Sequence, residues 1–319
     1  MLRLDPLKLE RPDTVAEAVA LLHERADARV IAGGTDLVPK LKRGQMRTGT
    51  LVSIDRITGL NRIDRVDGVV HIGARVPLDA LARHPDVQPL TSLATAARLV
   101  ATPTIRLRAT IGGNMLQDTR CRYYDRGEFW REAIGHCLKL DGDTCRVAHG
   151  GDRCHATFCS DIAPALAVLG ARATYASADE PEGRSIPVTE LYRDDGIRAV
   201  AIGRSIVTEF TVPDDAPPST YRKLRLRESF DFPEVGVAVS ARALDDGTAV
   251  TVAVSGVSSA LVVHHDTVVR SKTAMHVANA VFHLVRPMDT LYFPPGYRKK
   301  MTRRLVLESL HDLGLTPTD

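Results

Sequence analysis

What the sequence lacks excludes several classes of protein. Its 319 residues contain no apolar run of about 18 or more, which argues against a transmembrane helix. The 42 Lys and Arg residues nearly balance the 39 Asp and Glu residues, whereas dedicated nucleic-acid binders carry a much larger basic excess. Aromatic residues make up only 5%, yet the hydrophobic fraction of 44% is ordinary for a globular protein. At roughly 150 residues per domain, the length predicts about two domains.

Cysteine is also rare, and its placement is uneven. Five cysteines are too few for a disulfide scaffold in a chain of this length. None occurs in the 120 residues before the first cysteine or in the 160 residues after the last. The five are Cys121, Cys137, Cys145, Cys154 and Cys159. Thiols used as ordinary core residues would be scattered, so this clustering requires a specific explanation.

Hydrophobic periodicity predicts two successive units in the first two thirds of the chain. Thr14 and Glu17 have the spacing of a capping box, which marks the start of a helix. Residues 28–32 form a short apolar run typical of a buried strand, and residues 1–55 are expected to form a small α/β part. Strand-like and helix-like segments alternate over residues 56–214, which form a larger part; among them are an expected strand at 69–73 and an expected helix at 91–99.

A further domain is expected after a proline-rich linker. Residues 213–219 contain three prolines in seven residues. Strand-like runs between 235 and 254 then precede two helix-like runs, the second at 302–313, an order typical of α+β structure. We therefore predict an α+β protein with domains at residues 1–214 and 220–319.

Two paired-glycine turns are candidate ligand sites. Residues 32–36 read Ala-Gly-Gly-Thr-Asp, and residues 110–114 read Thr-Ile-Gly-Gly-Asn. Paired glycines can adopt positive φ and let amide N–H groups approach an anion, so the two turns together can hold the two phosphates of a dinucleotide. Taken singly, an isolated Gly-Gly pair is more often just a tight loop without a ligand. Neither has the Gly-x-Gly-x-x-Gly spacing, which argues against a Rossmann site.

Four cysteines have spacings compatible with a metal site. Cys121, Cys137, Cys145 and Cys154 are separated by 15, 7 and 8 residues. Thiolates surround one zinc ion tetrahedrally or bind one iron each in a cubane cluster. The intervening sequence is charged and turn-rich and contains little apolar material for a core. This favours a metal as the centre around which the segment folds. No Cys-x-x-Cys knuckle is present, so unconnected thiols remain an alternative, and the spacing does not separate iron from zinc.

The remaining ligand-type residues in this window have a simpler interpretation. His136, His149 and His155 are possible substitute ligands, but solvated loop histidines account for them as well. Cys159 lies beside the apolar run that begins at Ile162, and we expect it to be a free, partly buried thiol.

The ordered set of motifs resembles a known family. Residues 32–36, residues 110–114 and the Ser-Asp-Ile-Ala-Pro run at 160–164 look like the FAD-binding motifs of the medium subunits of xanthine oxidase-type molybdenum enzymes. Residues 221–227, followed by Asp231-Phe232, look like the start of the C-terminal domain found in carbon monoxide dehydrogenase flavoproteins. The resemblance covers essentially the whole chain and implies a two-part, PCMH-like FAD-binding domain. The FAD-binding positions it implies are Ile31, Ala32, Gly33, Gly34, Thr35, Asp36, Leu37, Val100, Thr110, Gly112, Gly113, Asn114, Asp161 and Lys223.

One departure from the family pattern accounts for the cysteines. Most members run almost directly from the Gly-Gly-Asn turn into the Ser-Asp segment, whereas residues 115–159 separate the two here. This insert is similar to that of the β subunits of 4-hydroxybenzoyl-CoA reductases, where four cysteines bind a [4Fe–4S] cluster. By that resemblance the ligands are Cys121, Cys137, Cys145 and Cys154, and Cys159 has no counterpart.

The resemblance implies an electron-transfer subunit. Electrons would pass between a ferredoxin-like carrier, the [4Fe–4S] cluster and FAD. A large molybdenum-cofactor subunit would carry the substrate site, and a small subunit with [2Fe–2S] clusters would lie between them. We expect a 4-hydroxybenzoyl-CoA reductase-like complex, because the insert suggests a low-potential donor. The alternative is the FAD subunit of a molybdenum hydroxylase or dehydrogenase that oxidises an aromatic or aldehyde substrate.

A different class of function is also open. A zinc-stabilised binding module without a redox role would use the basic stretch at residues 298–304 as an anion patch, although a solvated helix face explains those charges equally well. The expected location is the cytoplasm, since clustered thiols or an exposed cubane suit a reducing compartment. The expected partners are proteins, with no nucleic acid and no membrane span.

Overall fold

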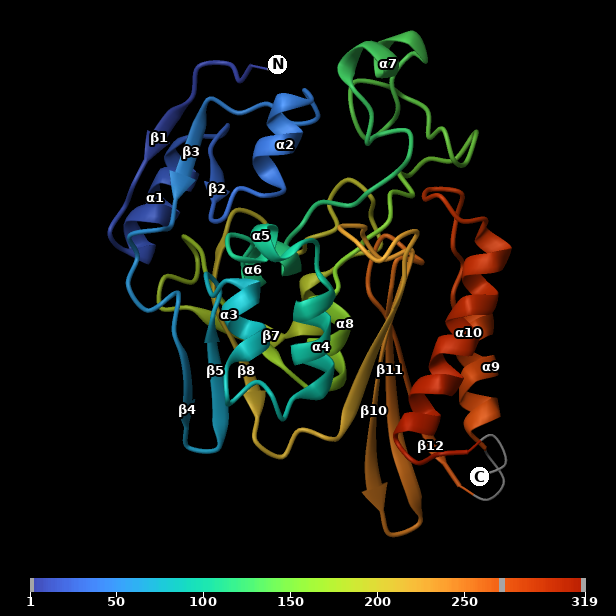
Figure 1. The fold of residues 1–319 in the computed structure, drawn as a ribbon. Helices are drawn as coiled ribbons and strands as arrows, with labels where there is room; N and C mark the ends of the chain where they lie inside the picture. The colour runs from blue at the N-terminus through green and yellow to red at the C-terminus, as the bar shows by residue number, and fades with distance from the viewer. Residues whose placement is uncertain (1–2, 270–272, 317–319) are drawn as a thin grey trace.

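Three β-sheets organise the chain (Figure 1), which we describe from a computed structural model covering residues 3–269 and 273–316. Their strands lie within residues 8–53, 63–213 and 219–268. Residues 270–272 and 317–319, which fall within the expected C-terminal domain, lie outside the described residues. No helix within the described ranges has the length and apolar character needed to cross a membrane.

The N-terminal part is a small parallel sheet with two helices. Its strands lie in the order β1-β3-β2. The elements are β1 (Lys8–Glu10), α1 (Val15–Glu24), β2 (Arg29–Ile31), α2 (Leu37–Lys42) and β3 (Thr50–Ser53). The expected cap of α1 is confirmed, because the Thr14 hydroxyl accepts the Glu17 N–H at 3.1 Å. The carboxylate of Glu17 reaches back one residue further than a capping box predicts, to the N–H of Asp13 at 2.9 Å.

The middle part is a five-stranded antiparallel sheet in the order β4-β5-β8-β6-β7. Its strands are β4 (Ile63–Val66), β5 (Val69–Gly73), β6 (Arg172–Ala176), β7 (Arg184–Pro187) and β8 (Ile206–Pro213). The accompanying helices are α3 (Leu78–Arg83), α4 (Thr91–Leu99), α5 (Pro103–Arg106), α6 (Ile111–Met115), α8 (Ile162–Val168) and the 3₁₀ helix η1 (Val188–Leu191). Helices α4 and α8 lie between this sheet and the C-terminal one, so a single hydrophobic core includes residues of both sheets.

The C-terminal part is a four-stranded antiparallel sheet in the order β12-β11-β10-β9. Its strands are β9 (Ser219–Leu224), β10 (Val235–Leu244), β11 (Gly247–Ser255) and β12 (Val262–Val268), and its helices are α9 (Ala274–Leu284) and α10 (Pro295–Asp312). One face packs on α4 and α8, and the other packs on α9 and α10. Helix α10 begins seven residues before the expected 302–313 run, because Pro295 occupies the first helical turn, where its fixed φ suits the helix start.

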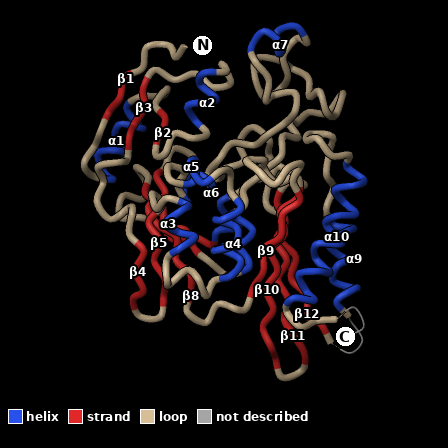
Figure 2. The backbone as a smooth tube through the Cα atoms, viewed as in Figure 1, coloured by secondary structure: helices blue, strands red, loops and turns tan. Residues whose placement is uncertain are grey.

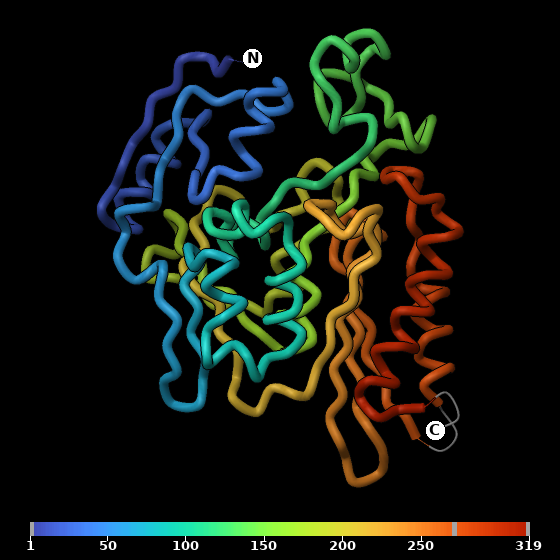
Figure 3. Tube along the Cα trace, in the orientation of Figure 1, coloured from blue at the N-terminus to red at the C-terminus, as the bar shows by residue number. Residues whose placement is uncertain are grey.

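The insert at residues 115–159 is mostly loop, with α7 (Glu128–Ala133) as its helix (Figure 2). It projects from one end of the molecule, between the N-terminal part and α10 (Figure 3). Contacts hold it on both sides: the Gln45 side-chain amide donates to the carbonyl of Tyr124 at 2.8 Å, and Arg122 pairs with Asp289 at 3.0 Å. The polar contacts attach the insert to the rest of the chain, and a small hydrophobic cluster packs inside it, formed by Cys121, Tyr124, Cys154 and Ala156.

Candidate cofactor sites

A large cleft opens where the three parts of the chain meet. Its volume is about 1310 Å³, and its walls include both glycine turns and the loop between β9 and β10. Typical small-molecule pockets measure roughly 300–1,000 Å³. The cleft is therefore large enough for an extended dinucleotide.

The first glycine turn brings bare backbone to the cleft. Gly34 has a φ of 71°, a conformation that favours glycine. A Cβ on Gly33 would collide with the carbonyl oxygen of Arg108, so this position excludes every other residue. Among the described residues, the amides of Gly33, Gly34 and Thr35 donate no hydrogen bond to the protein. Such free, closely spaced N–H groups at a cleft wall are the donors that a diphosphate requires.

The second glycine turn is fixed by its flanking side chains. Thr110 caps α6, and its hydroxyl accepts the N–H of Gly113 at 3.1 Å. A Cβ on Gly112 would approach the Ala74 carbonyl oxygen to 2.7 Å, so this glycine is also required. The side-chain oxygen of Asn114 accepts the hydroxyl of Ser160 at 2.7 Å, which ties the turn to the far end of the insert.

The structure brings most of the expected FAD-binding residues to the cleft. The lining positions are Ile31, Ala32, Gly33, Gly34, Thr35, Asp36, Leu37, Val100, Thr110, Gly112, Gly113 and Asn114. Asp161 and Lys223 are not among the lining residues. Twelve of the fourteen expected positions therefore share one cavity, and two lie behind its wall.

Asp161 and Lys223 form a buried ion pair. The Lys223 ammonium lies 2.9 Å from the Asp161 carboxylate, and the two side chains are 1% and 3% exposed. Tyr221 donates its hydroxyl to the same carboxylate at 2.7 Å, and Lys223 also donates to the Leu99 carbonyl at 3.0 Å. Burial raises the pKa of Asp161, while Lys223 and Tyr221 act against that rise. The pair joins β9 to the end of α4 and the start of α8 directly behind the cleft.

Several cleft residues were not found from the sequence. The insert contributes Arg120, whose guanidinium lies 2.5 Å from the Asp36 carboxylate and 3.3 Å from the centre of the Phe232 ring. The loop after β9 contributes Phe230 and Phe232, and the α9–α10 connection contributes Tyr292. Arg120 joins three distant segments, and nothing in its sequence neighbourhood indicates this. Phe232 belongs to a motif that the family resemblance marked only as the opening of a domain.

A second, smaller cavity lies inside the insert. The four expected ligands, Cys121, Cys137, Cys145 and Cys154, all line it and are 6–8% exposed. Its lining contains no carboxylate and no imidazole, so His136, His149 and His155 do not contribute. Among the described residues, no three His, Cys, Asp or Glu side chains are placed to hold a single metal ion. In a cubane each thiolate binds a different iron. The cavity measures about 10 Å³, so the four thiols would have to move apart to surround such a cluster.

The residues around this cavity fit an anionic thiolate cluster. Lys139 and Arg146 supply positive charge to its lining. The N–H of Ala156 donates to the Cys154 sulfur at 3.4 Å, as hydrogen bonds to cluster sulfurs do. Burial raises the pKa of Cys121 to about 12, so this thiol is protonated in the metal-free chain, and a bound metal would displace the proton.

Cys159 lies apart from the other four. It is fully buried, lines neither cavity, and its thiol contacts the carbonyl oxygen of Thr157 at 3.6 Å. Burial raises its pKa to about 12. Its environment is that of an inert core thiol, more deeply buried than the partly buried one expected from the sequence.

Comparison with known proteins identifies the family of this chain. Residues 5–215 match the FAD binding domain in molybdopterin dehydrogenase. The aldehyde oxidoreductase FAD-binding subunit PaoB of Escherichia coli (strain K12) is 34% identical over 247 residues, covering 72% of this chain and 75% of that protein. The chain belongs to this family. It is an oxidoreductase subunit, and family membership supports FAD as its cofactor.

Other relatives match over shorter stretches or in fold. The carbon monoxide dehydrogenase medium chain of Hydrogenophaga pseudoflava is 42% identical over 106 residues, 33% of this chain and 37% of that protein. A solved carbon monoxide dehydrogenase from the same organism has a TM-score of 0.76 at 22% identity, covering 97% of each chain. Quinoline 2-oxidoreductase from Pseudomonas putida 86 has a TM-score of 0.72 at 18% identity, covering 97% of this chain and 99% of that one. The mixed α/β fold is therefore that of the medium FAD subunits.

Proposed function

We propose that this chain is an electron-transfer subunit that binds FAD in the large cleft and a [4Fe–4S] cluster in the cysteine cavity of its insert. The observation that carries the proposal is that four buried thiols share one cavity whose lining holds no other metal-ligating side chain. When bound, FAD exchanges one or two electrons and the cluster exchanges one, so together they connect one-electron and two-electron reactions.

The chain's own residues bind and orient these groups. The free amides of the first glycine turn would hold the FAD diphosphate, while Arg120 and Phe232 close the cleft from the insert and the β9–β10 loop. The amides of the second turn, residues 111–114, already donate within the protein, so this turn would shape the cleft wall and would not bind a phosphate through its amides. Cys121, Cys137, Cys145 and Cys154 would ligate the four irons. In this scheme no acid, base or nucleophile of this chain reacts with a substrate.

The names of several relatives support an assembly with other subunits, and the resemblance of the insert suggests the electron carrier. Several are medium or FAD-binding subunits of dehydrogenase and oxidoreductase complexes. We infer a large molybdenum-cofactor subunit, a small [2Fe–2S] subunit, and a ferredoxin-like carrier that exchanges electrons with the cluster. Within this assembly we assign residues 1–214 to FAD binding and residues 220–319 to a C-terminal domain. A reducing compartment such as the cytoplasm suits the free thiols.

Two directions of electron flow remain as candidates for the complex. The similarity of the insert to that of 4-hydroxybenzoyl-CoA reductases supports electron flow from ferredoxin toward molybdenum. The relative that matches over 72% of the chain is named an aldehyde oxidoreductase subunit, which supports oxidation of an aldehyde or aromatic substrate and flow in the opposite sense. We favour the oxidative direction, because that likeness extends over most of the chain and the other lies in the insert.

The visible spectrum of anaerobically purified protein tests the cofactors. We expect flavin bands on a broad brown shoulder, with about four irons per chain. Cys137→Ser should lose the shoulder and keep the flavin bands. A colourless protein with one zinc per chain would contradict the proposal and favour a zinc-stabilised module.

A separate experiment decides the direction. The assembled complex is mixed anaerobically with either a set of aldehydes or reduced ferredoxin, and flavin bleaching is followed by stopped flow. Bleaching by an aldehyde supports the oxidative candidate. Bleaching by ferredoxin, followed by reoxidation with 4-hydroxybenzoyl-CoA, supports the reductive one.

A further inference from the structure

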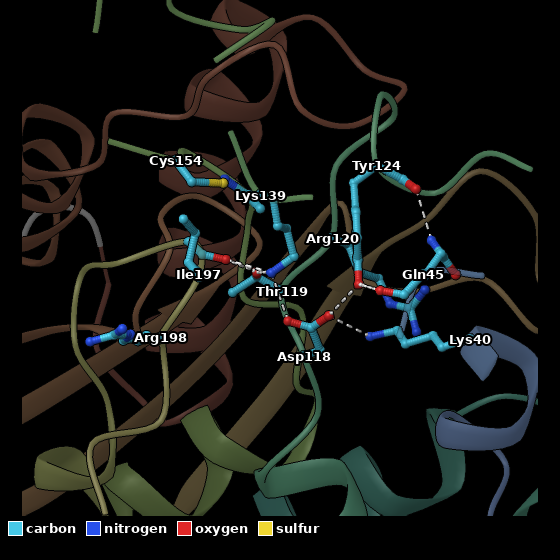
Figure 4. A network of polar contacts seen from close by, with 12 residues as sticks. Lys40, Gln45, Asp118, Thr119, Arg120, Tyr124, Lys139, Cys154, Ile197 and Arg198 are labelled. Atoms are coloured by element: carbon cyan, nitrogen blue, oxygen red, sulfur yellow. Dashed lines mark hydrogen bonds and ion pairs between the residues drawn. The ribbon is translucent and has the colours of Figure 1, made fainter. Parts of the chain in front are cut away.

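A partly buried carboxylate, that of Asp118 with a side chain 15% exposed, lies between the two candidate cofactor sites. Asp118 accepts a hydrogen bond from the Lys139 ammonium at 2.7 Å through one oxygen and from the Lys40 ammonium at 3.1 Å through the other. Tyr124 donates its hydroxyl to the second oxygen at 3.1 Å. Figure 4 shows Asp118 between the two lysines, which come from the insert and from α2.

Lys139 belongs to the cysteine cavity. It lines that cavity, its side chain is 5% exposed, and it also donates to the carbonyl of Gly196 at 2.6 Å. Gly196 is in turn pressed against Cys154, because a Cβ on Gly196 would stand 2.7 Å from the Cys154 sulfur. Figure 4 shows Cys154 beside Lys139. The ammonium is therefore held close to one of the four thiols.

Lys40 belongs to the FAD cleft. It is 2% exposed, it lines the cleft together with Asp118, and it pairs with Asp36 of the first glycine turn at 3.2 Å. An unpaired buried ammonium is strongly disfavoured, so a lysine at this depth requires a fixed counter-ion. Asp118 meets this requirement for both lysines.

The charge state of Asp118 agrees with this arrangement. Burial acts to raise the pKa of Asp118, but the ammonium groups of Lys139 and Lys40 outweigh it and bring the pKa to about 2. The carboxylate is ionised at every pH at which the protein would function. The contacts therefore constitute a fixed row of alternating charges, positive at each cofactor site and negative between them.

We propose that Asp118 is the shared counter-ion of the two cofactor sites, through which Lys139 sets the reduction potential of the cluster and Lys40 the affinity for FAD. This inference rests on the proposed function. Reduction adds negative charge to a cluster, so a nearby cation raises its potential and a nearby anion lowers it. Lys139 and Asp118 thus act on the cluster with opposite signs, which a purely structural role would not produce.

The test is an EPR-monitored redox titration of the cluster in the full complex. Lys139→Met should shift the cluster potential to lower values, and Asp118→Asn should shift it to higher values. Lys139→Arg should return it close to the wild-type value. Lys40→Met should raise the Kd for FAD and shift the cluster potential less than Lys139→Met does. The matched control is Lys42→Met, which removes an exposed positive charge from the same helix and should change neither quantity.

The outcomes are separable from those of the proposed function. A wild-type chain without a cluster overturns the proposed function, and this inference with it. Suppose instead that the wild-type chain holds a cluster. This inference alone is overturned if Lys139→Met and Asp118→Asn shift the cluster potential in the same direction, or if neither variant shifts it. If Lys139→Met fails to retain iron, the Asp118→Asn titration decides: an upward shift supports the inference and an unchanged potential contradicts it.

Discussion

The carbonyl oxygen of Arg108 occupies the space that a side chain on Gly33 would need. Arg108 precedes the second glycine turn, and Gly33 lies in the first, so the two turns meet by direct backbone packing. This contact fixes the two turns against each other at the cleft wall, beside the free amides of the first turn.

Gly33→Ala should therefore abolish FAD binding. The added methyl group must push the first turn away from Arg108, which displaces the amides of Gly34 and Thr35. The flavin absorbance per chain after gel filtration measures the loss. Gly296→Ala is the matched control, because a Cβ there meets no atom within 4 Å, and the variant should keep its flavin. Full flavin occupancy in Gly33→Ala would contradict the role given to this contact.

The ion pair between Asp161 and Lys223 should affect the stability of the fold more than it affects FAD binding. Lys223→Met leaves the Asp161 carboxylate buried without its cation, at a cost of about 3–5 kcal/mol in the free energy of unfolding. Adding Asp161→Asn should recover much of that loss, since no buried charge then remains. Urea denaturation of the wild type, Lys223→Met and the double variant measures both steps. A double variant less stable than Lys223→Met would show that the pair acts in another way.

Acid should lower the free energy of unfolding, partly through protonation of Asp118. Its pKa falls from 3.8 unfolded to about 2 in the folded chain, so the carboxylate stabilises the fold above about pH 4. That contribution, about 2 kcal/mol, is lost as the pH falls toward 2. Urea midpoints between pH 5 and pH 3 should therefore decline more steeply in the wild type than in Asp118→Asn. Parallel declines would assign the acid sensitivity to other carboxylates.

Cys159 should be dispensable for metal binding. It lines neither cavity, so Cys159→Ala should retain the iron content and visible spectrum of the wild type. Removing its buried sulfur should lower the free energy of unfolding by about 1 kcal/mol, through lost packing alone. Iron analysis and urea denaturation check the two statements. Loss of iron in this variant would mean that the ligand set had been assigned wrongly.

Local sequence signals located most of the fold. The Thr14 cap, the strand at 69–73 and the helix at 91–99 were predicted because each depends on residues within one or two turns. Both glycine turns were also found, since paired glycines are rare enough to stand out. The start of α10 was placed too late, because its first two turns are polar and have no apolar periodicity.

The site was predictable only in part, for a physical reason. Lys40 and Lys139 read as surface lysines in the sequence, and their burial depends on a carboxylate 78 and 21 residues away. Arg120 likewise pairs with Asp36, 84 residues earlier in the chain. Such contacts arise from tertiary packing, and no local pattern encodes them. Four of the five cysteines were the exception, because their clustering in sequence matched their clustering in space.

The hydrogen bond between Asn114 and Ser160 has a consequence for protein engineering. These residues flank the insert, 46 positions apart, yet they are joined at 2.7 Å as neighbours would be. A short antiparallel bridge between Arg120 and Thr157 joins the two ends of the insert a second time, a few residues inside the first contact. The insert thus leaves and re-enters the scaffold at one point, so a deletion that joins its two ends needs no long linker, although Lys40 would lose the carboxylate of Asp118.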